Sequence, residues 1–244
     1  MNSANVIEIF SSVQGEGKYL GCRQIFVRLA DCNLNCAYCD TDFKRAEFCR
    51  VETSAGSMTF RDVKNPLKPA QVAEVIKNFS DDVPTQAVSF TGGEPLLHWQ
   101  FVRDVASIVK NFGVKIFLET NGTLPEELAK ILDAVDIISM DIKLPHVGQN
   151  FFRLHEKFLR VAREKDLYVK IVAANETTSE EFSAAVELVA SIDPKILLII
   201  QPVTPFNGVN APSAEKILSF QAAALRQIKN VRVIPQTHKS IKLL

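Results

Sequence analysis

Seven short apolar runs recur along the chain, each rich in β-branched or aromatic residues. They lie at residues 24–29, 87–90, 115–118, 137–140, 168–172, 196–200 and 231–234. The runs are nearly continuous in apolar residues rather than alternating, which predicts strands covered on both faces. Amphipathic stretches between the runs predict helices at residues 70–79 (opened by Pro69), 101–111, 125–132, 151–164, 179–190 and 213–229.

The order of these elements predicts an α/β fold of six βα units followed by a seventh strand. Strands that alternate with helices imply a parallel sheet with right-handed crossovers. Eight such units close a barrel, so six predict an open, partial barrel. Residues 44–67 are polar and irregular, which is typical of a variable insertion. The chain has no repeat, low-complexity tract or linker, and we expect residues 1–244 to form a single domain.

Composition narrows the function classes. Hydrophobic residues make up 47% of the 244 residues, enough for a full-sized core. Lys+Arg and Asp+Glu both number 28, so the net charge of zero gives no overall attraction to nucleic acid or anionic membranes. The N-terminus has no basic region followed by an apolar stretch, and no apolar run approaches the ~20 residues of a membrane helix. We therefore expect a cytoplasmic enzyme that acts on a small molecule.

Three of the five cysteines form a candidate metal site. Cys32, Cys36 and Cys39 lie in one short loop, with three residues between the first two and two between the last two. A [4Fe–4S] cluster normally takes four thiolates. Three ligands would leave one iron with an open position, and open metal sites are those that bind substrates or cofactors.

Other chemistries for these thiols remain open at this point. Cys22 or Cys49 could supply the fourth ligand of a structural zinc site, although zinc motifs usually come as two short pairs. Buried thiols without a metal role are a further alternative. A disulfide framework is disfavoured, because the chain is large and shows no secretory segment.

Polar or glycine-rich segments follow six of the seven predicted strands. In parallel α/β folds, the loops after the carboxyl ends of strands collect the chemistry. Paired glycines allow a ligand to approach the backbone closely, although such pairs also mark many ordinary turns. After the cysteine loop, the segments are Thr91–Pro95 (TGGEP), Glu119–Gly122 (ETNG), Asp141–Lys143 (DIK), Gln201–Val203 (QPV) and Gln236–Lys239 (QTHK).

The cysteine loop together with the TGGEP segment resembles the radical S-adenosylmethionine (SAM) enzymes. Two flanking regions make the resemblance narrower: Ile9–Gly17 (IFSSVQGEG) with Ile25–Leu29, and the step from Cys39 into Asp40-Thr41 with the terminal stretch Gln236–Leu244. Together these are similar to the 7-carboxy-7-deazaguanine synthase family, which serves queuosine biosynthesis.

The resemblance implies a radical SAM lyase. Members convert 6-carboxy-5,6,7,8-tetrahydropterin to 7-carboxy-7-deazaguanine with loss of ammonia. SAM binds the open iron and is cleaved reductively to a radical that abstracts hydrogen from the pterin; SAM is regenerated and Mg²⁺ assists. The cofactors carry the chemistry, so no side chain is expected to be catalytic beyond the cluster and SAM. A flavodoxin- or ferredoxin-type reductant and a homodimer are also implied.

The resemblance also implies roles for individual residues. Cys32, Cys36 and Cys39 would hold the cluster, and Thr41 the Mg²⁺. SAM would contact Tyr38, Gly92, Gly93, Glu94, Glu119, Asn121, Ser139, Asp141, Lys143 and Gln201. The pterin would contact Val13, Gln14, Gly15, Glu16, Arg28, Thr91, His238 and the terminal carboxylate of Leu244.

The residue types suit these roles. The N–H donors of a pterin edge match carbonyls and carboxylates around residues 13–16, and the Arg28 guanidinium matches a carboxylate. Magnesium keeps waters and borrows substrate oxygens, so one hydroxyl from Thr41 is enough.

Plainer interpretations stand beside these roles. An arginine on a strand is often a salt-bridge residue, a lone histidine is often structural, and Asp141 with Lys143 could be a solvated pair. The serine-to-lysine spacing at residues 139–143 is longer than in some family members, which leaves the division between Asp141 and Lys143 open.

Two other function classes compete with the synthase. One is a radical SAM enzyme that activates a glycyl-radical partner. The other is a non-enzymatic iron–sulfur carrier or zinc-stabilised module, which would not cleave SAM.

Overall fold

The computed structural model describes residues 2–243, apart from the side chain of Val147. Its strands are β1 (Val6–Val13), β2 (Arg23–Leu29), β3 (Phe48–Glu52), β4 (Phe60–Lys64), β5 (Ala87–Gly92), β6 (Lys115–Thr120), β7 (Ile137–Ile142), β8 (Asp166–Ala173), β9 (Leu197–Pro202) and β10 (Val231–Val233). Its α-helices are α1 (Pro69–Asp82), α2 (Trp99–Val109), α3 (Pro125–Ile131), α4 (Phe152–Ala162), α5 (Ser179–Ile192), α6 (Ala214–Leu225) and α7 (Thr237–Ser240). Short 3-10 helices are η1 (Gly17–Tyr19), η2 (Pro95–His98), η3 (Lys110–Phe112), η4 (Leu132–Ala134) and η5 (Pro145–Val147).

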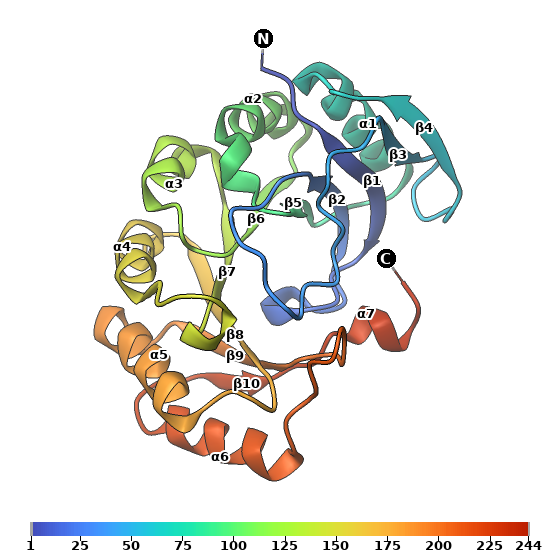
Figure 1. The fold of residues 1–244 in the computed structure, drawn as a ribbon. Helices are drawn as coiled ribbons and strands as arrows, with labels where there is room; N and C mark the ends of the chain where they lie inside the picture. The colour runs from blue at the N-terminus through green and yellow to red at the C-terminus, as the bar shows by residue number, and fades with distance from the viewer. Residues whose placement is uncertain (1, 244) are drawn as a thin grey trace.

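One curved sheet runs through the molecule in the order β10-β9-β8-β7-β6-β5-β2-β1-β3-β4. From β2 to β10, neighbouring strands are parallel, and helices α1 to α6 connect them along the outside of the curve (Figure 1). The end strands β10 and β4 lie at opposite edges of the sheet, so the barrel is open. The predicted architecture, six βα units followed by a seventh strand, is confirmed.

Alternation along each strand divides the two faces of the sheet. On β8, Leu167, Val169 and Ile171 belong to the main core between sheet and helices, whereas Tyr168 and Val172 belong to small clusters on the inner face. The inner face is apolar near the start of the strands and polar near their carboxyl ends. Each strand therefore appears almost wholly apolar in the sequence, because its polar inward-facing positions lie only at its carboxyl end.

The prediction that residues 44–67 are irregular is wrong, because they contain the antiparallel pair β3 and β4. Cys49 and Val51 are buried while Phe48 and Arg50 are exposed, a period-two pattern that covers only five residues. Such a short run, with one face of the strand exposed, gives too weak a signal against its polar surroundings.

The sequence pattern also missed β1, which lies between β2 and β3 and pairs antiparallel with β2. No helix within residues 2–243 has both the length and the apolar character needed to cross a bilayer.

Candidate functional site

A cavity of about 710 Å³ lies on the inner face at the carboxyl ends of the strands. Its volume is in the range of sites that enclose small-molecule ligands. The cysteine loop, the end of β1, the strand ends and the C-terminal segment all line it. Of the predicted site residues that the structure describes, all except Glu94 line this cavity, while Leu244 lies outside the described residues.

Strand register brings the polar inner positions together. Arg28 on β2 is the register partner of Thr91 on β5, and Glu119 on β6 is the partner of Ser139 on β7. Residues that are partners in parallel strands point to the same face of the sheet. A polar cavity floor therefore follows from inward-facing positions at the ends of adjacent strands.

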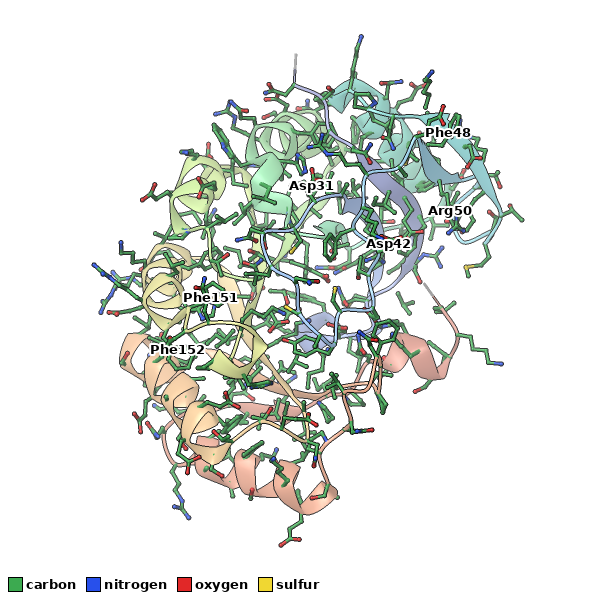
Figure 2. The ribbon with its side chains drawn as sticks, viewed as in Figure 1. Asp31, Asp42, Phe48, Arg50, Phe151 and Phe152 are labelled. Carbon is green, nitrogen blue, oxygen red and sulfur yellow. The ribbon has the colours of Figure 1, made fainter. Side chains whose placement is uncertain are left out.

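The cysteine loop is closed at its neck by protein contacts. The Asp31 N–H donates to Phe43 O at 2.8 Å, and Arg45 donates from Nε and Nη2 to the Asp31 carboxylate. His98 Nε2 lies 3.2 Å from Asp31 Oδ2. Hydrogen bonding from Arg45 lowers the pKa of Asp31. Asp31 and Asp42 lie on the two limbs of the loop (Figure 2), so this neck sets where the intervening cysteines stand.

The three loop cysteines line the cavity with partly buried thiols. Burial raises the pKa of Cys32 and of Cys36, so an electropositive partner such as a metal would be needed to hold them as thiolates. Within residues 2–243, no three or more His, Cys, Asp or Glu side chains are grouped to hold a single metal ion. In a [4Fe–4S] cluster each thiolate binds a different iron, so its ligands do not have to converge on one point.

The other two cysteines stand apart from this cavity. Cys49 is fully buried in β3, and burial raises its pKa to about 12. The Cys22 N–H donates to Tyr19 O in the turn after η1. Neither residue lines the cavity, which removes both from the position of a fourth ligand in a zinc site there.

The glycine pair has a role that the sequence did not predict. A Cβ on Gly93 would lie 1.8 Å from Asp31 O, and one on Gly92 would lie 2.3 Å from Leu29 O, with φ at +117°. Both glycines therefore let the end of β5 pack against the backbone at the start of the cysteine loop. Close approach of this loop accounts for the glycine at position 93, and because Gly93 also lines the cavity, its predicted contact with SAM stays a prediction.

The structure corrects the prediction for the Glu94 side chain, which is fully buried and does not line the cavity. Its carboxylate accepts hydrogen bonds from Leu96 N, Thr120 Oγ1 and Asn121 N at 3.1, 2.9 and 2.8 Å. Burial raises the pKa of Glu94 to about 7, and these donors oppose that rise. Glu94 thus joins the ends of β5 and β6 instead of contacting a ligand.

Asn121 lines the cavity, but its amide is occupied by protein partners. Its Nδ2 donates to Asn33 Oδ1 at 2.9 Å, and its Oδ1 accepts from both the N–H and the hydroxyl of Thr123. His155 Nε2 lies 3.1 Å from Asn121 O, and burial lowers the pKa of this histidine to about 4. The neutral ring must therefore donate from Nε2, which fixes its tautomer. This network ties the cysteine loop, through Asn33, to the end of β6.

Asp141 and Lys143 form a largely buried pair, so the solvated alternative is wrong. Lys143 Nζ lies 2.8 Å from Asp141 Oδ2 and 3.3 Å from Tyr38 Oη, with side-chain exposures of 10% for the lysine and 17% for the aspartate. Burial opposes the charge of Lys143, but Asp141 more than compensates and raises the lysine pKa well above its usual value. Both residues and Tyr38 line the cavity.

Two residues that line the cavity each carry a buried oxygen without a hydrogen-bond partner among the described residues, Asp141 Oδ1 and Gln201 Oε1. Buried polar atoms are normally paired, so these acceptors suit a ligand that brings its own donors. The amino group, ribose and adenine of SAM are donors of this kind. The residues around the cysteine loop therefore fit SAM.

At the far side of the cavity, a hydrogen-bonded chain links the predicted SAM and substrate residues. Gln14 Nε2 donates to Glu119 Oε1 at 2.9 Å, and Thr91 Oγ1 donates to Glu119 Oε2 at 2.7 Å. Gln14 Oε1 accepts from Glu16 N at 3.0 Å. Gln14 thus uses the nitrogen of its amide to hold Glu119 and the oxygen to hold the backbone at Glu16.

Arg28 lies in the cavity and is also a salt-bridge residue. Its Nε donates to Glu8 Oε1 at 2.8 Å, and Arg50 Nη1 lies 3.6 Å from Glu8 Oε2. Figure 2 labels Arg50 on β3, which the sequence had assigned to an irregular insertion. Among the described residues, no hydrogen bond uses the two Nη groups of Arg28. These two guanidinium nitrogens are therefore available to bind a ligand.

Glu16 is held by two partners that sequence reasoning did not find. Lys170 Nζ bonds to Glu16 Oε2, and Gln236 Nε2 donates to Glu16 Oε1 at 2.8 Å. Lys170 is the inward-facing neighbour of Asp141 across β7 and β8. A lysine within the apolar stretch of β8 was the available signal, because an isolated charge in a buried strand needs a partner.

The C-terminal segment closes this end of the cavity. Thr237 N donates to Gly15 O at 3.0 Å, and Lys239 forms an ion pair with Asp40 of the cysteine loop. A Cβ on Gly15 would lie 2.1 Å from His238 Nδ1, so this glycine makes room for the histidine ring. Residues 13–16 and the C-terminal segment that contains α7 thereby line one cavity.

Comparisons with known proteins agree with this geometry. A family model described as the Radical SAM superfamily matches residues 27–190. The 7-carboxy-7-deazaguanine synthase of Geobacter sulfurreducens is 37% identical, over 97% of this chain and 96% of that protein. The synthase of the same name from Methanocaldococcus jannaschii is 38% identical, over 97% and 99%. The crystal structure of QueE from Escherichia coli superposes with a TM-score of 0.61 at 19% identity, covering 96% of this chain and 94% of that one, which shows the shared fold.

Proposed function

The chain belongs to the radical SAM superfamily and, within it, to the 7-carboxy-7-deazaguanine synthases, and on that basis we propose that it converts 6-carboxy-5,6,7,8-tetrahydropterin to 7-carboxy-7-deazaguanine. Ammonia is lost as the pterin ring contracts. The observation that carries this proposal is one cavity lined both by the three-cysteine loop and by the residues 13–16 segment with the C-terminal stretch. Cofactor and substrate residues thus face the same space.

The loop side of the cavity would hold the cofactors. Cys32, Cys36 and Cys39 would bind the [4Fe–4S] cluster, and the unpaired acceptors of Asp141 and Gln201 would receive donors of SAM. The predicted SAM contacts of Tyr38, Gly92, Gly93, Glu119, Asn121, Ser139 and Lys143 stay part of this proposal. When bound, the cluster and SAM supply the one-electron chemistry that starts the reaction, and the protein supplies aim and exclusion of water.

The opposite side would hold the pterin. The Glu16 carboxylate and the backbone of Val13 and Gly15 offer acceptors to the N–H donors of the pyrimidinone edge. The free Nη groups of Arg28 would take the substrate carboxylate. Thr41, Thr91, His238 and Leu244 complete the proposed set, with Thr41 as the protein ligand of Mg²⁺ and water and substrate oxygens as the other ligands of the ion.

Turnover of carboxytetrahydropterin by the anaerobically reconstituted protein tests this function. We expect 7-carboxy-7-deazaguanine and ammonia to form in equal amounts, with SAM, a reductant and Mg²⁺ present. Protein that cleaves SAM but leaves the pterin unchanged would exclude this substrate and favour another radical SAM reaction. Protein that does not cleave SAM at all would favour an electron carrier.

Arg28→Ala should separate substrate binding from SAM chemistry. Removing one partner of a buried charge pair costs about 2–5 kcal/mol, or roughly 30- to 5,000-fold in kcat/KM for the pterin. SAM cleavage in the absence of substrate should stay at the wild-type rate. Arg153→Ala, at an exposed position of α4, is the matched control and should leave both activities intact. Parallel loss of both activities in the Arg28 variant would make this arginine structural.

The partner and location predictions rest on family membership alone. We propose a flavodoxin- or ferredoxin-type reductant, a homodimer and a cytoplasmic location.

A further inference from the structure

A buried ion pair fixes the carboxylate that faces the proposed substrate site. Lys170 projects from the inner face of β8 with 9% of its side chain exposed, and Glu16 is 15% exposed. Both oxygens of Glu16 have a protein donor, Lys170 on Oε2 and Gln236 on Oε1. Charge-assisted bonds from two directions hold the carboxylate in one orientation.

Lys170 is the cation that keeps Glu16 charged in this setting. Burial alone would raise the pKa of Glu16, but Lys170 and the bond from Gln236 lower it to about 2. The other charged or titratable groups near the pair are Asp141 on β7, Glu119 on β6, Tyr168 on β8 and His238 in the C-terminal segment. Asp141 is already paired with Lys143, and both oxygens of Glu119 already accept bonds.

The protonation state of Glu16 decides what this side of the cavity can bind. An ionised carboxylate only accepts hydrogen bonds, whereas a protonated one also donates. A 2-amino-4-oxopyrimidine ring offers adjacent N–H donors along one edge. A 2,4-dioxo ring has a carbonyl in place of the amino group, so an acceptor would face the carboxylate, which is a repulsive contact.

We propose that Lys170 is a positioning residue that holds Glu16 as a fixed, acceptor-only carboxylate and thereby selects a ring edge with adjacent N–H donors. The proposal rests on the proposed function, because the pterin is the ligand that offers this edge. Lys170 acts through Glu16 and does not itself contact the substrate.

Lys170→Met tests the role, because it keeps most of the length and apolar volume and deletes the charge. Glu16 then stays buried without its cation, and burial lifts a carboxyl pKa by up to about 3–5 units. Since the group must be ionised to bind, kcat/KM for the pterin should fall as pH drops below the new pKa, about tenfold per pH unit. The loss should appear mainly as a higher KM, at least about tenfold at pH 6. In the wild-type protein, kcat/KM for the pterin should show no such fall between pH 6 and 8.

Three further variants make the result specific. Lys157→Met, at an exposed position of α4, is the matched control and should keep the wild-type profile. The double variant Glu16→Gln with Lys170→Met should lose the pH dependence, because the titrating group is gone. If the methionine variant loses its cluster, Lys170→Gln takes its place, since it is neutral but can still donate one hydrogen bond to Glu16.

Only variants whose cluster content matches that of the wild type are scored. An unchanged pH profile and KM in a Lys170 variant with an intact cluster would overturn the positioning role. Equal inhibition of the wild type by a 2,4-dioxo analogue and its 2-amino-4-oxo counterpart would overturn the selection. Wild-type protein that cleaves SAM without consuming the pterin would instead refute the proposed function.

Discussion

Alanine at Cys32, Cys36 or Cys39 is expected to abolish cluster binding and SAM cleavage, the largest loss that single substitutions should cause in this protein. These thiols line the cavity from one loop, and a cluster with three protein ligands has no spare thiolate to replace a missing one. The measurements are iron and sulfide content after anaerobic reconstitution, the visible absorption of the cluster, and formation of 5′-deoxyadenosine. Wild-type protein should bind about four irons and four sulfides.

Cys22→Ala and Cys49→Ala are the matched controls. Neither residue lines the cavity, so cluster content and SAM cleavage should stay at wild-type levels. Cys49 is fully buried in β3, and loss of its sulfur should cost roughly 1 kcal/mol, seen as a fall of about 2–4 °C in Tm. Loss of the cluster in either control would indicate a four-thiolate site with no open iron.

Gly93→Ala is expected to remove most of the cluster, although this residue is not a ligand. The new Cβ would lie 1.8 Å from Asp31 O and 2.5 Å from the Asp31 carbonyl carbon. Both are backbone atoms, so the start of the cysteine loop must move, and Glu94 N would lose its 2.8 Å bond to Asp31 O. We expect reconstituted iron content to fall at least about fivefold and SAM cleavage to fall with it, as a severe steric clash requires.

Gly113→Ala provides a control for the cost of backbone substitution. Gly113 has φ at +75°, but a Cβ there would meet nothing within 4 Å. The strain of about 1–2 kcal/mol should lower thermal stability without affecting the cluster. A Gly93→Ala protein that keeps its full iron content and loses only SAM binding would contradict the packing role and leave direct contact with SAM as the role of Gly93.

Several motif residues serve the arrangement of the site more than contact with a ligand. Gly15 makes room for His238, Gly93 for Asp31, and Glu94 joins two strand ends while buried. A motif in sequence shows that a position is special without showing which atom must approach it. A substitution at a residue that arranges the site should therefore have wider effects than one at a ligand contact, because it displaces several groups of the site at once.

The sequence by itself predicted the elements whose signals are local. Strands covered on both faces appear as apolar runs, helices as amphipathic stretches, and their strict alternation leads to a parallel open barrel. Since parallel strands carry their loops to one end, the same order also predicted that the six polar strand ends share one site. The three-cysteine spacing needed no tertiary information, because its ligands lie within eight residues of one loop.

Only the tertiary structure decided the features that depend on distant partners. Strand β3 is stabilised by pairing with β1, and the edge strand β4 by pairing with β3, whereas their five-residue runs give little signal alone. The charge of Glu16 depends on Lys170, 154 residues away, and the bond from Gln236 spans 220 residues. Burial and pairing of a charge arise when the sheet assembles, so local pattern could mark these residues as candidates but could not assign their partners.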